Sequence, residues 1–143
     1  MSTKTIRGYQ TFDHTADVGL EIWGDTFNAI FEEAGKALFG LILDSGKVVS
    51  KESFAIQLSS ESGEELFFSW LKELLYIFDT KKVLLSDFTV LNLDPWKLEA
   101  KVSGEKLDRA KHRLGHEVKA VTRHAFEFKK TKNGFYARIV LDI

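Results

Sequence analysis

Acidic side chains at the two ends of this chain are the residues best suited to do chemistry. Near the start, Asp13, His14 and Asp17 place two carboxylates and an imidazole within five residues. At the other end, Asp142 directly precedes Ile143, whose terminal carboxylate would add another acidic group. Carboxylate oxygens, in a chain without cysteine, favour hard cations such as Ca²⁺ or Mg²⁺ over zinc. The two ends of the chain are therefore candidates for one divalent metal site.

The apolar residues around these carboxylates predict that the two ends meet. Apolar and other residues alternate over 18–22, as in a strand with one buried face, and Asp17 stands at its start on the opposite parity. A second such strand spans 135–141, with Asp142 off its apolar parity. If the two strands are antiparallel neighbours, these like charges come together and need a cation or a shifted pKa. The pattern alone leaves open that Asp17 is a turn or capping residue and Asp142 a solvated chain end.

Two amphipathic helices and a set of strands must position these residues. Apolar residues at spacings of three and four predict helices over 27–42 and 66–78, and Ser62 with Glu65 has capping-box spacing. Alternating patterns, with turn residues at Asp94-Pro95 and Asn133-Gly134, predict strands over 17–23, 54–58, 83–93, 96–103, 118–128 and 135–141. We expect a single domain, 1–143, of the α+β class, in which two helices pack on one face of a mixed β-sheet in two layers.

Composition narrows the function classes. The 143 residues are 44% hydrophobic with a net charge of −1, which is typical of a globular domain and not of a protein that coats nucleic-acid duplexes. The absence of cysteine excludes disulfides, thiolate metal sites and cysteine nucleophiles. No P-loop, dinucleotide fingerprint, nucleophile elbow or zinc-protease motif is present. Because neither a signal peptide nor a membrane span is visible, we expect a cytoplasmic protein that does not bind membranes.

His14 and Asp44 each allow two interpretations. His14 could ligate a metal or transfer protons near neutral pH, although a histidine before a strand more often hydrogen-bonds a backbone group. Asp44 follows the first helix, where an acidic residue is an ordinary stop signal. A negative charge there opposes the helix dipole, which hints at another role.

A basic stretch could form a second kind of site. The cations of the polar connection 104–115 and of the strand after it are Lys106, Arg109, Lys111, His112, Arg113, Lys119 and Arg123. Long connections are often functional, and clustered cations can bind phosphate, RNA or an acidic partner. A solvated loop and strand face is the simpler interpretation, and the residues alone leave both open.

Blocks of residues in order along nearly the whole chain resemble the archease family. They are His14-Thr15-Ala16-Asp17 with Trp23-Gly24-Asp25-Thr26, Ala37-Leu38-Phe39-Gly40 with Asp44, Phe68 to Tyr76 with Phe78-Asp79, Gly104-Glu105 with His112, Glu117 to Thr122 with His124, and Val140-Leu141-Asp142-Ile143. The ordered set is specific, whereas His-Thr-Ala-Asp alone would be weak. The chain departs from the family at Arg123, where tyrosine is frequent, and at His116, where threonine is frequent.

The resemblance implies an accessory protein of the RtcB-type RNA-splicing ligase, and not an enzyme itself. Such proteins promote guanylylation of the ligase's active-site histidine in tRNA splicing and can broaden its nucleotide use. The family's metal ligands carry over to Asp17, Asp142 and Ile143, with Ca²⁺ as the usual ion and Mg²⁺ or Mn²⁺ as alternatives. The family's activation residues carry over to Asp44 and Lys119, and His14 could support the metal ligands.

Two other functions share these residues. A stand-alone metal-dependent phosphohydrolase would use the acidic site without a partner. A chaperone-like interaction module would need the site only for structure. In the ligase interpretation we expect a monomer that binds the RtcB-type ligase and touches RNA only indirectly or weakly.

Overall fold

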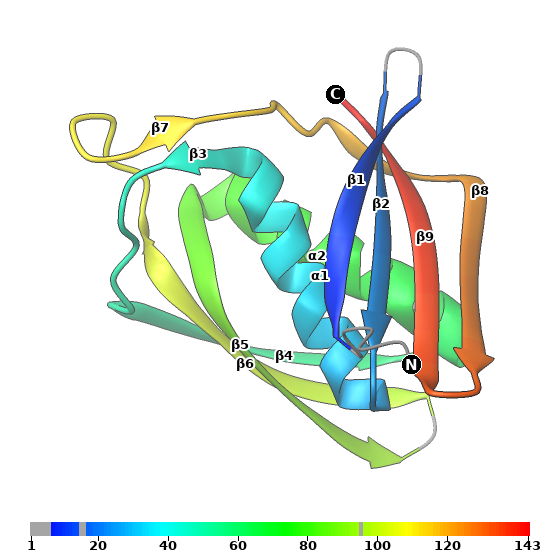
Figure 1. The fold of residues 1–143 in the computed structure, drawn as a ribbon. Helices are drawn as coiled ribbons and strands as arrows, with labels where there is room; N and C mark the ends of the chain where they lie inside the picture. The colour runs from blue at the N-terminus through cyan, green and yellow to red at the C-terminus, as the bar shows by residue number, and fades with distance from the viewer. Residues whose placement is uncertain (1–6, 15–16, 95) are drawn as a thin grey trace, which may run out of the picture.

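The chain folds into nine strands and two helices in a computed structural model that describes residues 7–14, 17–94 and 96–143. In chain order the elements are β1 (Gly8–His14), β2 (Asp17–Gly24), α1 (Phe27–Ile42), β3 (Leu43–Ser45), β4 (Glu52–Ser59), α2 (Gly63–Lys81), β5 (Val83–Asp94), β6 (Lys97–Lys106), β7 (Arg113–Leu114), β8 (Ala120–Thr131) and β9 (Gly134–Asp142) (Figure 1). The α+β class and the two predicted helices are confirmed.

The strands form three sheets. One has four strands in the order β1-β2-β9-β8, one has three in the order β4-β6-β5, and β3 pairs with β7. Every strand pair within the described ranges is antiparallel. The single mixed sheet that the pattern predicted is thus replaced by separate antiparallel sheets. Antiparallel strands can be joined by tight turns, whereas a parallel pair needs a long crossover connection.

Both helices begin at side chains that cap them. The hydroxyl oxygen of Thr26 accepts a hydrogen bond from the N–H of Ala29 at 3.0 Å, and that of Ser62 accepts one from Glu65 at 3.1 Å. These bonds satisfy N–H groups that have no partner inside the helix. The predicted cap at Ser62 is confirmed. Among the described residues, no helix is long and apolar enough to cross a membrane.

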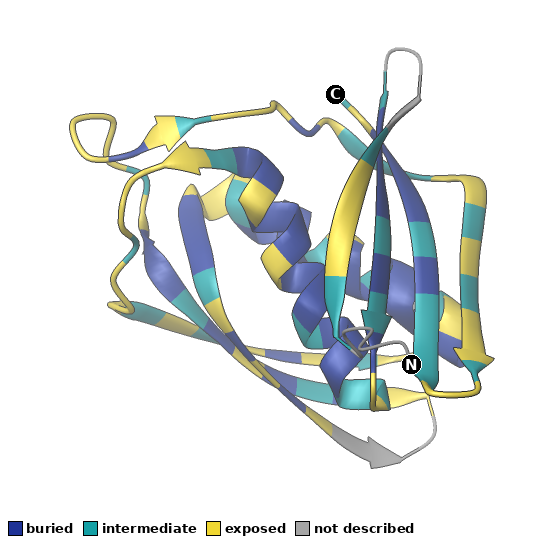
Figure 2. Cartoon of the chain, in the orientation of Figure 1, coloured by how far each residue is buried: buried dark blue, intermediate teal, exposed yellow. Residues whose placement is uncertain are grey.

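An aromatic cluster joins the helices to the sheets. The rings of Phe31 and Phe67 lie 5.3 Å apart, and Phe128 of β8 lies 5.0 Å from Phe67. The buried indole N–H of Trp70 donates to the carbonyl oxygen of Phe31 at 2.8 Å, which ties α2 to α1. Each helix contacts strands of both large sheets, and Figure 2 shows the buried residues concentrated along α1, α2 and the strand segments beside them. The core therefore holds the two sheets in a fixed relation.

The two predicted hairpins are found as strand pairs. β5 pairs with β6, and β8 pairs with β9 around the Asn133-Gly134 turn. Gly134 has φ +145°, a conformation that glycine adopts without strain. Pro95, the centre of the other predicted turn, lies outside the described residues.

Candidate functional site

Asp17 and Asp142 face each other across neighbouring strands. Asp17 begins β2 and Asp142 ends β9, and the two are direct register partners. Directly opposed residues in an antiparallel pair project to the same face with Cβ atoms about 5 Å apart. Asp142 is exposed and Asp17 is half-buried, and both lie off the parity of the buried residues Leu20 and Leu141. The meeting of the two chain ends that the strand pattern predicted is therefore confirmed.

The register row through this pair crosses the whole four-stranded sheet. His14 of β1 is the partner of Asp17, and Ala120 of β8 is the partner of Asp142. The side chain of His14 lies outside what the structure describes, as do Thr15 and Ala16, so its predicted supporting role stays a prediction. The row stands at the upper edge of the sheet in Figure 1, beside the C-terminus.

The segment between β7 and β8 carries Lys119 to this edge. The N–H of Lys119 donates to the carbonyl oxygen of Asp142 at 2.7 Å, so the backbone of the lysine is fixed beside the acidic pair. Val118, one residue earlier, is buried in the core and anchors the segment. The side chain of Lys119 is exposed. Glu117 and Lys119 precede β8, so the strand predicted over 118–128 begins only at Ala120.

The same segment approaches Asp44 at its other end. The N–H of Gly115 donates to the carbonyl oxygen of Ile42 and that of His116 to Leu41, both at 2.8 Å. A Cβ added to Gly115 would lie 2.8 Å from the Leu41 oxygen and 3.5 Å from the Cβ of Asp44, so glycine permits this close approach. The four residue steps from Gly115 to Lys119 span at most about 14 Å. Asp44 and Asp142 are thus joined by one short, backbone-anchored segment.

Asp44 itself is open to solvent. Its side chain is 60% exposed, and its Oδ2 lies 3.8 Å from Nε of Arg113, which is 81% exposed. An ion pair this open contributes little to stability because water and salt screen it. Its charge is therefore available to another molecule.

Comparison with known proteins shows which family this chain belongs to. Residues 9–143 match the family described as "Archease protein family (MTH1598/TM1083)". The chain belongs to the archease family. The protein archease of Pyrococcus abyssi is 37% identical over 142 residues, covering 96% of this chain and all of that protein. The protein archease of Methanosarcina acetivorans is 34% identical over 139 residues, covering 94% of this chain and 95% of that one.

A solved archease structure has the same fold. The solution structure of Methanobacterium thermoautotrophicum protein 1598 aligns with a TM-score of 0.83 at 34% identity, covering 95% of this chain and 99% of that one. The resemblance seen in the sequence blocks is therefore confirmed for family and fold.

The donor atoms of this archease edge suit a weak, open divalent-ion site. Two carboxylates with Cβ atoms about 5 Å apart can share one ion at the oxygen distances of about 2.3–2.6 Å that Ca²⁺ uses. Within the ranges that the structure describes, no three or more side chains of His, Cys, Asp or Glu group together as metal ligands. Asp17 and Asp142 could supply only part of the six to eight oxygens that Ca²⁺ takes. The Ile143 carboxylate, water or a partner's oxygens would have to supply the others.

A buried ionic cluster anchors the loop that precedes this edge. Glu105 is buried, and its Oε1 lies 2.7 Å from Nζ of Lys111, 3.0 Å from the N–H of Val49 and 3.1 Å from Nε2 of His112. The hydrogen bond from Lys111 is the main reason that the pKa of Glu105 falls to about 2, and Val49 and His112 lower it further. Nδ1 of His112 accepts from the N–H of Asp108, so a neutral ring carries its proton on Nε2, toward Glu105.

This cluster changes the interpretation of the basic loop. Lys111 and His112 both bind the Glu105 carboxylate, and Arg113 lies beside Asp44. Exposed charge remains on Lys106 and Arg109. The loop is therefore first a structural connection, and RNA binding by it stays a prediction. A weak signal for this role was present in the family blocks, since Glu105 and His112 both fall in them while the residues around them are polar.

Arg123 is also bound within the chain. Its guanidinium donates to both carboxylate oxygens of Glu65, at 2.7 and 2.8 Å, and lies 3.9 Å from the centre of the Phe68 ring. The register of β8 against β9 shifts between Thr122 and Glu127, and Ala125 there has φ +53°. This bulge lets the arginine reach α2, and Glu65 holds it in place. A phosphate bound at Arg123 would therefore have to compete with the Glu65 carboxylate for the guanidinium.

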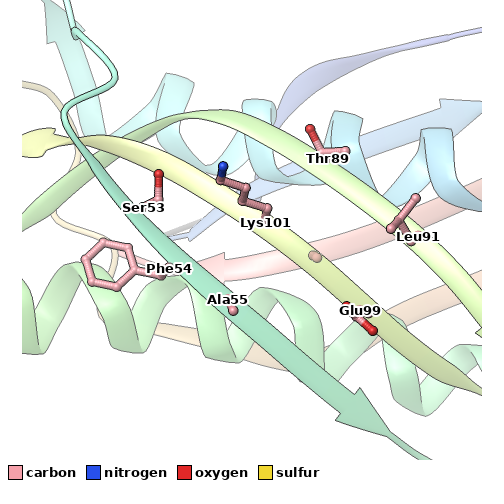
Figure 3. A pocket seen from close by; sticks show the side chains of 8 residues that line it. Ser53, Phe54, Ala55, Thr89, Leu91, Glu99 and Lys101 are labelled. Atoms are coloured by element: carbon pink, nitrogen blue, oxygen red, sulfur yellow. The ribbon is translucent and has the colours of Figure 1, made fainter.

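A shallow hollow lies elsewhere, on the outer face of the three-stranded sheet (Figure 3). Its volume is about 440 Å³, and the residues that line it are Ser53, Phe54, Ala55, Thr89, Leu91, Glu99, Ala100 and Lys101. None of the predicted site residues lines it. The sheet edge with Asp17 and Asp142 is the better candidate site because it combines opposed carboxylates with the fixed backbone of Lys119.

Proposed function

We propose that this member of the archease family activates an RtcB-type RNA ligase by promoting guanylylation of the ligase's active-site histidine. The observation that supports this most is the opposed pair Asp17 and Asp142. The carbonyl oxygen of Asp142 also accepts a hydrogen bond from the N–H of Lys119. An exposed acidic edge with a cation beside it is suited to meet the charged groups of a nucleotide-binding site. In this proposal the chain supplies groups to another enzyme and catalyses no step by itself.

Negative charge develops on phosphate oxygens during guanylylation and must be stabilised. The ligase histidine attacks the α-phosphorus of GTP, the bond to the β-phosphate oxygen breaks, and pyrophosphate leaves. A divalent ion bound to phosphate oxygens would stabilise the charge that develops in this step. The carboxylates of Asp17 and Asp142, with that of Ile143, would hold such an ion at the docking edge, with Ca²⁺ as the first candidate and Mg²⁺ or Mn²⁺ as alternatives.

Lys119 and Asp44 would orient the complex. Lys119 is held by its backbone but has an exposed side chain, so its ammonium can reach a phosphate or a ligase carboxylate. Asp44 is exposed at the other end of the same segment and can pair with a cation of the ligase. Two opposite charges at a fixed spacing would favour one orientation of docking over others.

A multiple-turnover ligation assay with a cognate RtcB-type ligase tests the proposal. Wild-type protein should accelerate turnover, and Asp17→Asn should lower that acceleration at least about 10-fold because it removes one charged ligand. The matched control is Asp25→Asn, which removes a carboxylate just beyond the opposite end of β2 and should act like wild type. Circular dichroism establishes that each variant is folded.

Three outcomes would count against the proposal. Absence of acceleration by the wild-type protein would favour the chaperone-like module. Full acceleration by folded Asp17→Asn at every metal concentration would remove the acidic pair from the mechanism. Hydrolysis of phosphoesters by the protein alone with divalent metal would favour a stand-alone hydrolase.

A further inference from the structure

The acidic pair projects from the outer face of the four-stranded sheet. β1, β2, β9 and β8 lie side by side (Figure 1), and side chains along each strand alternate between its two faces. Leu20 of β2 and Ile139 of β9 are fully buried in the core with the helices. Asp17 and Asp142 have the opposite parity and therefore stand on the other face. The side chains beside them on that face can meet the same ligand.

Arg138 stands on this face and reaches toward the acidic pair. On β9 it precedes Asp142 by four residues, so their Cα atoms are about 14 Å apart. Midway between them, Val140 is the register partner of Gly19. A Cβ added to Gly19 would overlap the ring of Phe12, so the ring lies over this glycine. Cζ of Arg138 is 4.5 Å from the centre of that ring, which places the guanidinium about 7 Å along the sheet from the acidic pair.

The position of Arg138 is fixed by packing. Val140 has no exposed surface, although it does not belong to the core that packs with the helices. Its neighbours in the register row are Gly19 and Thr122, which are too small to cover it. We attribute its cover to the ring of Phe12 and the stem of Arg138. The arginine is accordingly half-buried and stacked in place, unlike a freely moving surface side chain.

The carboxylates next to Arg138 are bound to other groups. Glu21, its register partner on β2, accepts hydrogen bonds from Tyr136 and Gln10, one on each oxygen and both at 2.7 Å. The bond from Tyr136 lowers the pKa of Glu21 most, and the charge of Arg138 lowers it least. Glu127, the partner on β8, lies 3.6 Å from a lysine of its own strand. Within the part of the chain that the structure describes, Nε of Arg138 is buried without a hydrogen bond and the guanidinium forms no ion pair.

A guanidinium at this distance from an acidic pair fits a chain of phosphates that carries a divalent ion. Asp17 and Asp142 supply only part of an ion's oxygen ligands, and phosphate oxygens are frequent further ligands of Mg²⁺. A guanidinium binds a phosphate through two parallel N–H···O bonds. In a di- or triphosphate, one phosphate can bind the ion while the next binds Arg138. A single phosphate is too small to do both.

The charges on this face make phosphate binding depend on the metal ion. The charged side chains that the structure describes there are Asp17, Asp142, Glu21, Glu127, Lys129 and Arg138, with Lys119 at the edge. Because carboxylates outnumber cations, a phosphate chain without metal is repelled. A divalent ion on the acidic pair reverses the balance, so ion and phosphate chain should bind cooperatively.

We propose that Arg138 is the phosphate-binding residue of a site for a metal-bound di- or triphosphate, formed together with Asp17 and Asp142. Phe12 is a positioning residue, because its ring holds the guanidinium. The choice of ligand rests on the proposed function, in which GTP enters guanylylation and pyrophosphate leaves it. Binding is nevertheless a property of this chain alone and can be measured without the ligase.

Isothermal titration calorimetry of the full chain with pyrophosphate and with GTP, each in Mg²⁺, tests the site. Both ligands should bind with similar dissociation constants, below about 1 mM, since the site contacts only phosphates. Removal of Mg²⁺ by a chelator should weaken both at least about 10-fold, because the repulsion between the carboxylates and the phosphates is then uncompensated.

Variants of the two cations on this face locate the binding. Arg138→Gln removes the charge but keeps most of the stem, and should raise the dissociation constant of pyrophosphate at least about 10-fold. Arg138→Lys keeps a charge without the paired N–H groups and should be intermediate, which keeps the test decisive if the glutamine variant does not fold. The matched control is Lys129→Gln, one register row farther from the acidic pair, which should bind within about 2-fold of wild type.

Several results would overturn the site. Neither ligand binding at about 10 mM with Mg²⁺ would do so, as would unchanged binding by folded Arg138→Gln. Equal losses in Arg138→Gln and Lys129→Gln would show only a general attraction to positive charge. Binding of GTP without any binding of pyrophosphate would place recognition on the nucleoside. Conversely, intact phosphate binding by a protein that does not stimulate the ligase would support this site and count against the proposed function.

Discussion

Glu105 and Asp142 are both carboxylates near the ends of strands, yet their surroundings are opposite. Glu105 is buried and has Lys111, His112 and a backbone N–H as partners within 3.1 Å. Asp142 is exposed, and its register partner is another carboxylate, Asp17. A carboxylate with its partners inside the chain fixes structure. Two carboxylates opposed at an open edge suit a ligand from outside.

The two regions are connected along the chain. The loop that the Glu105–His112 cluster holds leads through β7 to the segment that ends at Lys119. That segment is bonded to Leu41 and Ile42 at one end and to Asp142 at the other. The buried cluster thus supports the geometry of the exposed one, and substitutions should separate stability from function.

Removal of His112 should have the largest effect on stability. Its side chain is fully buried and bridges Glu105 and the N–H of Asp108. His112→Ala leaves the N–H of Asp108 without its acceptor and removes one of the partners of Glu105, and should lower the free energy of unfolding by about 2–3 kcal/mol in urea denaturation. The control is His116→Ala, an exposed residue of the next segment, which should change it by less than about 0.5 kcal/mol. Equal losses of unfolding free energy in the two variants would show that His112 does not anchor the loop.

Acid should destabilise the protein through Glu105. Its pKa is about 2 in the folded chain against an ordinary value of 4.5. Because the folded-state pKa is the lower one, this stabilisation is complete above pH 4.5 and is lost as the pH falls toward 2. Unfolding free energies measured through this window should decline, and Glu105→Gln should decline less steeply. An identical slope in the variant would contradict the assignment.

Gly115→Ala should have a smaller structural effect with a functional consequence. The new Cβ would lie 2.8 Å from the Leu41 oxygen, so the segment must move. We expect a loss of about 1 kcal/mol in unfolding free energy and weaker ligase stimulation, since Lys119 shifts with the segment. A folded variant with full stimulation would show that the position of this segment is unimportant.

Asp142→Asn should change stability least. Removal of one of two opposed like charges should change the free energy of unfolding by no more than about 0.5 kcal/mol. We expect a small increase in stability, because the repulsion between the two carboxylates is removed. It should, however, abolish any rise in melting temperature that Ca²⁺ gives the wild-type protein. Asp25→Asn should retain that rise. A calcium effect that survives in Asp142→Asn would place the ion elsewhere.

The sequence predicted local features and one long-range contact well. Alternation around Leu20 and Leu141, with the polar residues at the strand ends, was enough to bring Asp17 and Asp142 together. The cap at Ser62 follows from residue type and spacing, because a cap depends on a few neighbouring atoms.

Other features depend on tertiary contacts that no local pattern contains. The division of the strands into separate sheets depends on which strands pair over long separations. The strands β3 and β7 are too short to show a period, and the bulge of β8 is defined by its pairing with the distant residues of β9. Glu105 and His112 lie in a polar stretch, so their burial became visible only in the fold.

Guanylylation of the ligase itself is the most direct measurement of the central claim. A cognate RtcB-type ligase is incubated with GTP labelled at the α-phosphate, and the covalent ligase–guanylate is followed with wild-type protein, Asp17→Asn or Asp25→Asn. The account predicts faster formation with wild type and Asp25→Asn, and at least about 10-fold less acceleration with Asp17→Asn. Equal rates with wild type and folded Asp17→Asn would contradict it.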